Sequence, residues 1–300
     1  MTAPDERLDV SGTGMLAAPA NRARWRQYPI VPIAILLTFL IIPALFADQL
    51  SPYDPKASPG GLINRLQPPA WAGGSWDHLL GTDRAGRDVL SRIIHGSRVS
   101  LFVAVLGIGI GGLVGTVSGL VAGYFRGWIG AIIMRVTDMS LAFPSILLAL
   151  VLVAAVGPGF HAVVIVISTI LWAYYSRQVR AETLTIMNQD FVARARVSGA
   201  SHLRIILRHV FPNVVDTLLV LATLQVGFVI LLEASLSFLG VGIPRPTPAW
   251  GLMVAEGREY VVTAWWISFF PGMAILLSVL SLNLLGDWLR DRLDPRLQNL

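Results

Sequence analysis

Long uncharged apolar runs alternate with short polar segments along the chain, and this alternation predicts membrane-spanning helices. A helix that crosses roughly 30 Å of hydrocarbon needs about 20 mostly apolar residues. The uncharged run 139–176 is too long for one crossing, and we expect it to break at 157–159, where Gly-Pro-Gly permits unusual dihedrals and ends a helix. The pattern predicts an all-α, polytopic membrane protein with six transmembrane helices, at about 29–47, 99–123, 134–156, 160–177, 213–237 and 264–286.

Six crossings place both chain ends on the same side of the membrane, and the positive charges predict which side. Arginine gathers before the first span, between the second and third, between the fourth and fifth, and after the sixth. Cytoplasmic loops carry an excess of Lys and Arg, so the N-in/C-in orientation is expected. The expected organisation is a flexible cytoplasmic N-terminal tail (1–28), a transmembrane domain (29–290) with an outer segment (48–98) and a cytoplasmic loop (178–212), and a cytoplasmic C-terminal tail (291–300).

The composition is typical of a membrane protein and excludes several classes of function. Hydrophobic residues make up 54% of the chain and charged residues only 14%, against about 25% charged in ordinary soluble domains. The net charge of +5 lies in loops between apolar runs, which excludes a nucleic-acid binder. The chain has no cysteine, which excludes disulfides, thiolate metal sites and cysteine nucleophiles.

The outer segment starts with a Pro/Gly-rich stretch that should be irregular and ends in a helical pattern. Leu90, Ile93 and Ile94 recur at helical spacing opposite a polar face that includes Arg92, which predicts an amphipathic helix along the outer membrane interface. The alternative is a solvated loop that caps the second span. His78 and His95 lie in the same segment without metal-ligand spacing, so no metal site is expected.

The loop between the fourth and fifth spans carries too many charges to cross the membrane. Gly199 is suited to ending a short helix in the left-handed conformation, Ser201 to capping a second helix, and Pro212 to the first turn of the fifth span. Small residues near Gly199 would let another protein approach the backbone closely. The prediction is a helix, a turn and a helix lying flat on the cytoplasmic face. The alternative is an amphipathic linker that rests on lipid headgroups.

Glu233 is the only carboxylate deep in an apolar run after the first span. It lies about 30 Å up a straight helix from Asn213, near the outer interface, so a structural hydrogen bond or a place at the mouth of a pathway is favoured over a proton relay. The segment that begins at Ser237 and contains Trp250 is either backbone that folds back into the protein or a plain outer connection. Glu233, Ser237 and Trp250 are the candidates for a translocation path or outer gate.

Sequence motifs for catalysis are missing from the chain. It contains no Gly-rich phosphate-binding motif that ends in Gly-Lys-Ser/Thr, no Gly-x-Ser-x-Gly elbow and no His-Glu-x-x-His helix. We therefore expect that the chain is not an enzyme, binds no metal and does not itself hydrolyse ATP.

The cytoplasmic loop and three other stretches resemble a known family. In that family the loop reads Glu-Ala-Ala, three residues, Gly, and after nine more Ile-x-Leu-Pro; here 193–195 read Ala-Arg-Ala, followed by Gly199 and Pro212, so the glutamate and the second alanine are absent. LGTDRAGRDVLSR from Leu80, EASLSFLGVGIPRPTPAWG from Glu233 and NLLGDWLRDRLDPR from Asn283 are similar to segments of the same family. Over roughly 30–296 the chain resembles the inner-membrane permease subunits of ABC importers, specifically the C-type permease of the dipeptide/oligopeptide/nickel branch.

The resemblance implies a type I importer permease with defined partners. Two permeases, usually different chains in a heterodimer, would form one translocation path. One or two cytoplasmic ATPase subunits would hold ATP and Mg, while this chain would bind no cofactor. A soluble extracytoplasmic substrate-binding protein would deliver peptide at the outer face of a prokaryotic plasma (inner) membrane. The implied ATPase-coupling residues are Asp190, Phe191, Ala193, Arg194, Ala195, Gly199, Ala200, Ser201, Arg204 and Pro212.

Other functions remain open on the sequence. Within the importer, nickel complexes or glutathione are alternative cargoes, although the spans hold no carboxylate or His cluster for a bare metal ion. From other classes, the chain could be a passive membrane channel or a membrane scaffold protein. A channel would need a pore-lining ring or a carbonyl filter, and no stretch of the sequence has such a pattern.

Overall fold

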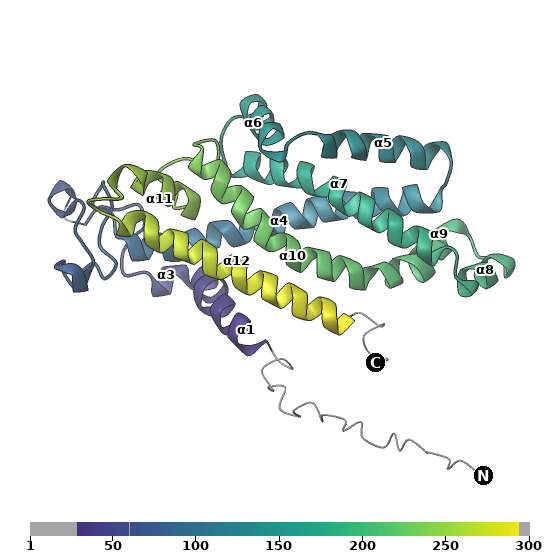
Figure 1. Cartoon of the computed structure of the whole chain (residues 1–300), viewed down its shortest axis with the longest axis horizontal. Helices are drawn as coiled ribbons and strands as arrows, with labels where there is room; N and C mark the ends of the chain where they lie inside the picture. Colours follow the sequence, from purple (N-terminus) through teal and green to yellow (C-terminus); the bar gives the residue numbers. More distant parts are fainter. Residues whose placement is uncertain (1–28, 60, 294–300) are drawn as a thin grey trace, which may run out of the picture.

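The computed structural model describes residues 29–59 and 61–293, whose helices run mostly along one long axis (Figure 1). The expected tail 1–28 and the last seven residues of the expected C-terminal tail lie outside these residues. The α-helices are α1 (Ile30–Leu36), α2 (Ile42–Leu45), α3 (Ala47–Leu50), α4 (Val89–Tyr124), α5 (Trp128–Ala142), α6 (Ser145–Val156), α7 (Phe160–Ile186), α8 (Asp190–Val197), α9 (His202–Ile205), α10 (Phe211–Phe238), α11 (Trp250–Gly257) and α12 (Trp266–Leu293). The π turns are η2 (Leu37–Ile41) and η5 (Ile206–Val210), and the 3₁₀ turns are η3 (Gly61–Asn64), η4 (Ala70–Ala72) and η6 (Arg258–Tyr260).

The helices form an all-helical membrane fold, as the apolar pattern predicted. Within the described residues, four helices are long and apolar enough to cross a bilayer: Val89–Tyr124, Phe160–Ile186, His202–Phe238 and Trp266–Arg292. The apolar helix Ile30–Leu45 is shorter. The range expected as one span at 134–156 contains two helices, α5 and α6, bent by 94°. The bend lies before Pro144, which drives Phe143 out of the helical region to ψ 134°.

Helices α4 and α7 pack closely along a row of glycines on α4. A Cβ added at Gly115 would lie 2.4 Å from the carbonyl oxygen of Trp172, and one at Gly119 would lie 2.7 Å from that of Ser176. Gly109, on the same helix, has no atom within 4 Å of the added Cβ. Glycine is therefore required on the face of α4 that meets α7, where small residues let membrane helices approach.

Proline shapes two helices through π turns rather than by ending them. Pro43 follows η2, and Pro212 follows η5, at the second position of the α-helix in each case. Proline lacks an N–H and crowds the carbonyl four residues earlier, and a π turn takes up that disruption. The sequence predicted a separate short helix before a span that starts at Pro212. This was wrong: His202 to Phe238 is one continuous helical run.

The first turns of α4 also differ from the prediction. The segment expected as a separate amphipathic helix, or as a solvated loop, is the beginning of α4 itself. Its polar face is the covered one: Ser91 and Arg92 are fully buried, whereas Leu90, Ile93 and Ile94 are partly exposed. Helical spacing identified the two faces correctly but could not tell which face the rest of the chain would cover.

Candidate functional site

At one end of the molecule α8 and α9 project beyond the long helices (Figure 1). A helix, a turn and the start of a second helix follow one another as the sequence predicted, although the second helix continues into α10. α8 ends at Val197, and Gly199 follows with φ +76°, a left-handed conformation that glycine adopts without strain. The Ser201 hydroxyl oxygen accepts a hydrogen bond from the backbone N–H of Arg204 at 3.4 Å, so Ser201 caps α9 as expected.

One side of this element anchors it to the bundle. Val192, Ile205 and Val210 are buried in a cluster with Val179 of α7 and Val214 of α10. The Tyr124 hydroxyl at the end of α4 lies 2.7 Å from His202 Nδ1. α8 and α9 are therefore packed against α4, α7 and α10.

The other side of the element is exposed, apolar and basic. Val197, Leu203 and Leu207 are 90%, 65% and 57% exposed. We call these three residues, together with Arg194, Arg196, Arg204 and Arg208, the α8 surface. The four arginines form no ion pair with any residue in 29–59 or 61–293.

The structure places the predicted coupling residues together on or beside the α8 surface. Asp190, Ala193, Arg194, Gly199, Ser201, Arg204 and Pro212 are exposed, and Phe191, Ala195 and Ala200 are partly buried. Large exposed apolar side chains among unpaired arginines are typical of a surface that another protein covers.

At the opposite end, a buried ionic cluster joins the outer segment to the segment around α11. Arg87 Nε donates to Asp83 Oδ2 at 2.7 Å, and Arg92 pairs with the same carboxylate. Arg92 also lies 3.0 Å from Glu256 Oε2, and Arg245, which is half-exposed, donates to Glu256 Oε1 at 2.6 Å. We call these five residues the outer ionic cluster.

Burial and charge act in opposite directions on Asp83 in this cluster. Burial raises the pKa of its carboxyl, while Arg92, Arg87 and backbone N–H groups lower it, and the net effect is a pKa below the ordinary value. Asp83 is therefore ionised at neutral pH and holds both arginines. Sequence reasoning did not single out this cluster, because its partners lie up to 169 residues apart.

The predicted path or gate residues lie near the same end, buried inside the chain. Ser237 donates to Glu233 Oε1 at 2.7 Å, and both side chains are buried. Trp250 is fully buried and donates its Nε1–H to the carbonyl oxygen of Ile93 at 2.9 Å. Gly96 makes room for this ring, since a Cβ there would lie 2.6 Å from Trp250 Cδ1.

Comparison with known proteins places this architecture in a family. Residues 115–299 match the family described as binding-protein-dependent transport system inner membrane component. The fold is similar to that of a chain in inward-facing structures of the MetNI methionine ABC transporter, with a TM-score of 0.57 and 15% identity over 68% of this chain and 96% of that one.

Curated relatives match across most of the chain. The di/tripeptide transport system permease protein DppC of Pseudomonas aeruginosa is 44% identical over 88% of this chain and 87% of the relative. The glutathione transport system permease protein GsiD of Escherichia coli is 41% identical over 91% and 88%. With a family match over more than half of its length and relatives this similar, the chain belongs to the binding-protein-dependent transport system inner membrane components, the permease subunits of ABC importers.

Proposed function

We propose that this chain forms one half of the translocation path of an ATP-driven importer for di- or oligopeptides in a bacterial inner membrane. A second permease chain would form the other half, and an extracytoplasmic binding protein would deliver the peptide. Relatives named for di/tripeptide and peptide transport support this cargo, and a relative named for glutathione, itself a tripeptide, is compatible with it. Nickel complexes remain the alternative cargo within the importer.

The observation that carries the proposal is the α8 surface. It lies on an element that is anchored in the bundle on one side and exposed on the other, which suits a lever between a cytoplasmic ATPase and the spans. Its arginines favour a groove that carries carboxylates, and Val197 and Leu203 would be covered there. ATP and Mg would be held by the ATPase.

We further propose six crossings with both ends in the cytoplasm, four of them made by the long apolar helices. The bent pair α5–α6 would serve as one broken crossing, and α1, η2 and α2 as a short first crossing that is 16 residues long. The α8 end would then face the cytoplasm, and the outer ionic cluster would face the binding protein. Because Glu233, Ser237 and Trp250 are buried within the chain, we propose that they position the outer gate rather than contact the peptide.

Purification of the chain from its native membrane in mild detergent tests the function. The proposal expects a second permease, one or two ATPase subunits, and ATP hydrolysis that rises when binding protein and a dipeptide are added. Stimulation by glutathione or a nickel complex instead would change the cargo. Recovery of the chain alone, or as a homo-oligomer without ATPase after cross-linking, would favour a channel or scaffold.

Gly199 offers a matched pair of variants in the same assay. Asn and Asp both adopt the left-handed conformation and have nearly the same shape, so Gly199→Asn and Gly199→Asp differ chiefly in charge. We expect Gly199→Asp to place a carboxylate against an acidic groove and to lower peptide-stimulated hydrolysis about tenfold, with Gly199→Asn much closer to the parent. Equal activity of both variants at equal expression would contradict docking through this turn.

A further inference from the structure

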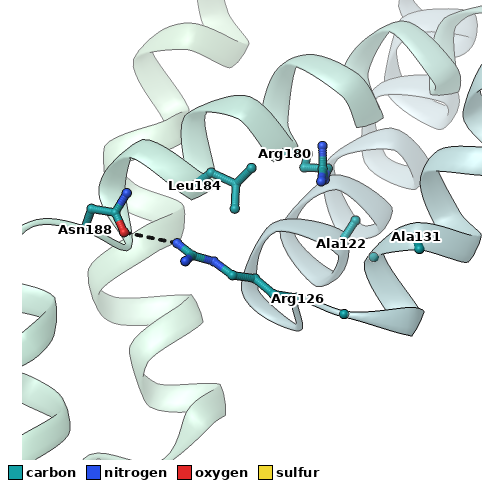
Figure 2. Close-up of a pocket in the computed structure, with 8 residues that line it drawn as sticks. Ala122, Arg126, Ala131, Arg180, Leu184 and Asn188 are labelled. Atoms are coloured by element: carbon teal, nitrogen blue, oxygen red, sulfur yellow. Dashed lines mark hydrogen bonds between the residues drawn. The ribbon is translucent and has the colours of Figure 1, made fainter.

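A pocket of about 450 Å³ lies beside the α8 end, where α4, α5 and α7 meet (Figure 2). Arg126 at the α4–α5 turn and Arg180 of α7 line it, and no carboxylate does so among the described lining residues. Leu184 adds an apolar wall. The family match and the α8 docking surface leave this pocket without a role.

Arg126 and Arg180 have spare hydrogen-bonding capacity. Arg126 donates one hydrogen bond, to Asn188 Oδ1 at 3.1 Å, and Arg180 has no hydrogen bond or ion pair with any described residue. The Nε of Arg180 is buried, so water cannot readily accept a hydrogen bond from it. A guanidinium without a partner at a partly buried position can bind an anion through charge-assisted hydrogen bonds.

The backbone contributes a third positive feature. α5 begins at Trp128 and no side chain caps it; the first backbone bond within it is donated by the N–H of Ala131 to the carbonyl oxygen of Gly127. The N–H groups of Trp128, Ile129 and Gly130 therefore have no partner among the described residues, and they carry the positive end of the helix dipole. Gly130 lets α5 approach α4 closely at the pocket, because a Cβ there would lie 2.7 Å from the carbonyl oxygen of Ala122.

The surroundings of the pocket indicate the source of the anion. Trp128 is 73% exposed beside the pocket, as expected of an aromatic side chain at a membrane interface. Ile132, Val136 and Met139 form an exposed apolar stripe along α5, which starts one residue after Ala131 of the pocket lining. A molecule with an anionic head and apolar chains would satisfy both surfaces at once.

We propose that this pocket binds the phosphate of an anionic phospholipid headgroup, held by Arg126, Arg180 and the first N–H groups of α5, with the acyl chains along the apolar stripe. Basic pockets between transmembrane helices are suited to such headgroups. A free phosphate ester shares the chemistry of the headgroup but has no acyl chains that could contact the apolar stripe. The proposal requires only that the α8 end lies at a membrane surface, and it is independent of cargo and transport direction.

Lipid retention by the full chain in mild detergent tests the site. The probes are dioleoylphosphatidylglycerol, dioleoylphosphatidylcholine and inorganic phosphate, and bound lipid is counted by native mass spectrometry. We expect one phosphatidylglycerol to bind in preference to phosphatidylcholine, and Arg126→Gln or Arg180→Gln to weaken it about fivefold each. The control Arg177→Gln removes an exposed arginine one turn away on α7, paired with Asp138, and should change retention little.

A second pair of variants keeps both arginines, in case their loss disturbs folding. Ala131→Glu places a carboxylate in the pocket at the first turn of α5, where acidic residues favour a helix, and should exclude phosphatidylglycerol. Ala181→Glu adds the same charge on the exposed side of α7, outside the pocket, and should not.

Three results would overturn the proposal. The first is equal phosphatidylglycerol retention by the parent, Arg180→Gln and Ala131→Glu. The second is displacement of the lipid by millimolar inorganic phosphate with the same dependence on the variants, which would assign the pocket to a free phosphate. The third is a cross-link from Ala131→Cys to an ATPase subunit in the assembled complex, which would assign it to a protein partner.

Discussion

Individual charged residues decide how the end of the molecule opposite α8 is held together. The two buried carboxylates of the outer ionic cluster, Asp83 and Glu256, are balanced by two buried arginines, Arg87 and Arg92, while Arg245 is half-exposed. A buried charge is tolerated when its partners are in place and becomes costly when one is removed. The cluster therefore stabilises the contact between the outer segment and the segment around α11, and it makes that contact sensitive to single substitutions.

Glu256 has one exposed and two buried arginine partners, which allows an internal comparison. Glu256→Gln should lower the free energy of unfolding by about 3 kcal/mol, because Arg87 and Arg92 lose a buried counter-charge. Arg245→Gln breaks a half-exposed pair and should cost at most about 1 kcal/mol. Thermal unfolding of the purified chain measures both, and similar costs for the two variants would show that burial does not set the strength of the cluster.

At the scale of elements, the features that could be predicted are those set by neighbouring residues. The break between α6 and α7 lies at Gly157–Gly159 as predicted, and Gly199 and Ser201 shape the turn after α8 as predicted. The bend before Pro144 was missed although its signal was present, because the apolar run continues through the proline.

Features set by distant residues could not be predicted from the sequence. The covered face of α4 is polar at Arg92, and only the carboxylate of Glu256, far along the chain, explains why. The pocket at Arg126 and Arg180 likewise depends on how α4, α5 and α7 meet. Helical spacing identifies which residues share a face but not which face the other helices cover.

The contact between α4 and α7 gives a prediction at this scale. Gly115→Ala adds a methyl group that would lie 2.4 Å from the Trp172 carbonyl oxygen, so the helices must separate. We expect a cost of about 1–3 kcal/mol in stability. Gly109→Ala lies on the same helix with open space around it and should be neutral or slightly stabilising, since alanine favours a helix. Thermal unfolding in detergent compares the two, and equal effects would contradict the close contact.

Over the whole molecule, α4 connects the two functional ends. Its 36 residues span about 54 Å, well beyond the roughly 30 Å of bilayer hydrocarbon. Arg92 in its first turns belongs to the outer ionic cluster, and Tyr124 at its last residue contacts His202 of α9. One continuous helix thus runs from the proposed binding-protein side to the proposed ATPase side, and the glycine-lined contact packs α7 closely against it.

The orientation of this helix in the membrane follows from the proposed topology, and the absence of cysteine makes it testable. Val262→Cys and Val197→Cys are matched substitutions at sites that are 95% and 90% exposed at opposite ends. In intact cells a maleimide that cannot cross the inner membrane should label position 262 and not 197, because only position 262 lies outside that membrane in the proposed topology. Permeabilisation of the inner membrane should expose position 197. The ATPase subunits should then shield position 197 and leave 262 unchanged, since the α8 surface is the proposed docking site. The reverse pattern would mean that the chain has the opposite orientation and that α8 lies outside the cytoplasm. Labelling of both sites in intact cells would contradict an odd number of crossings between them.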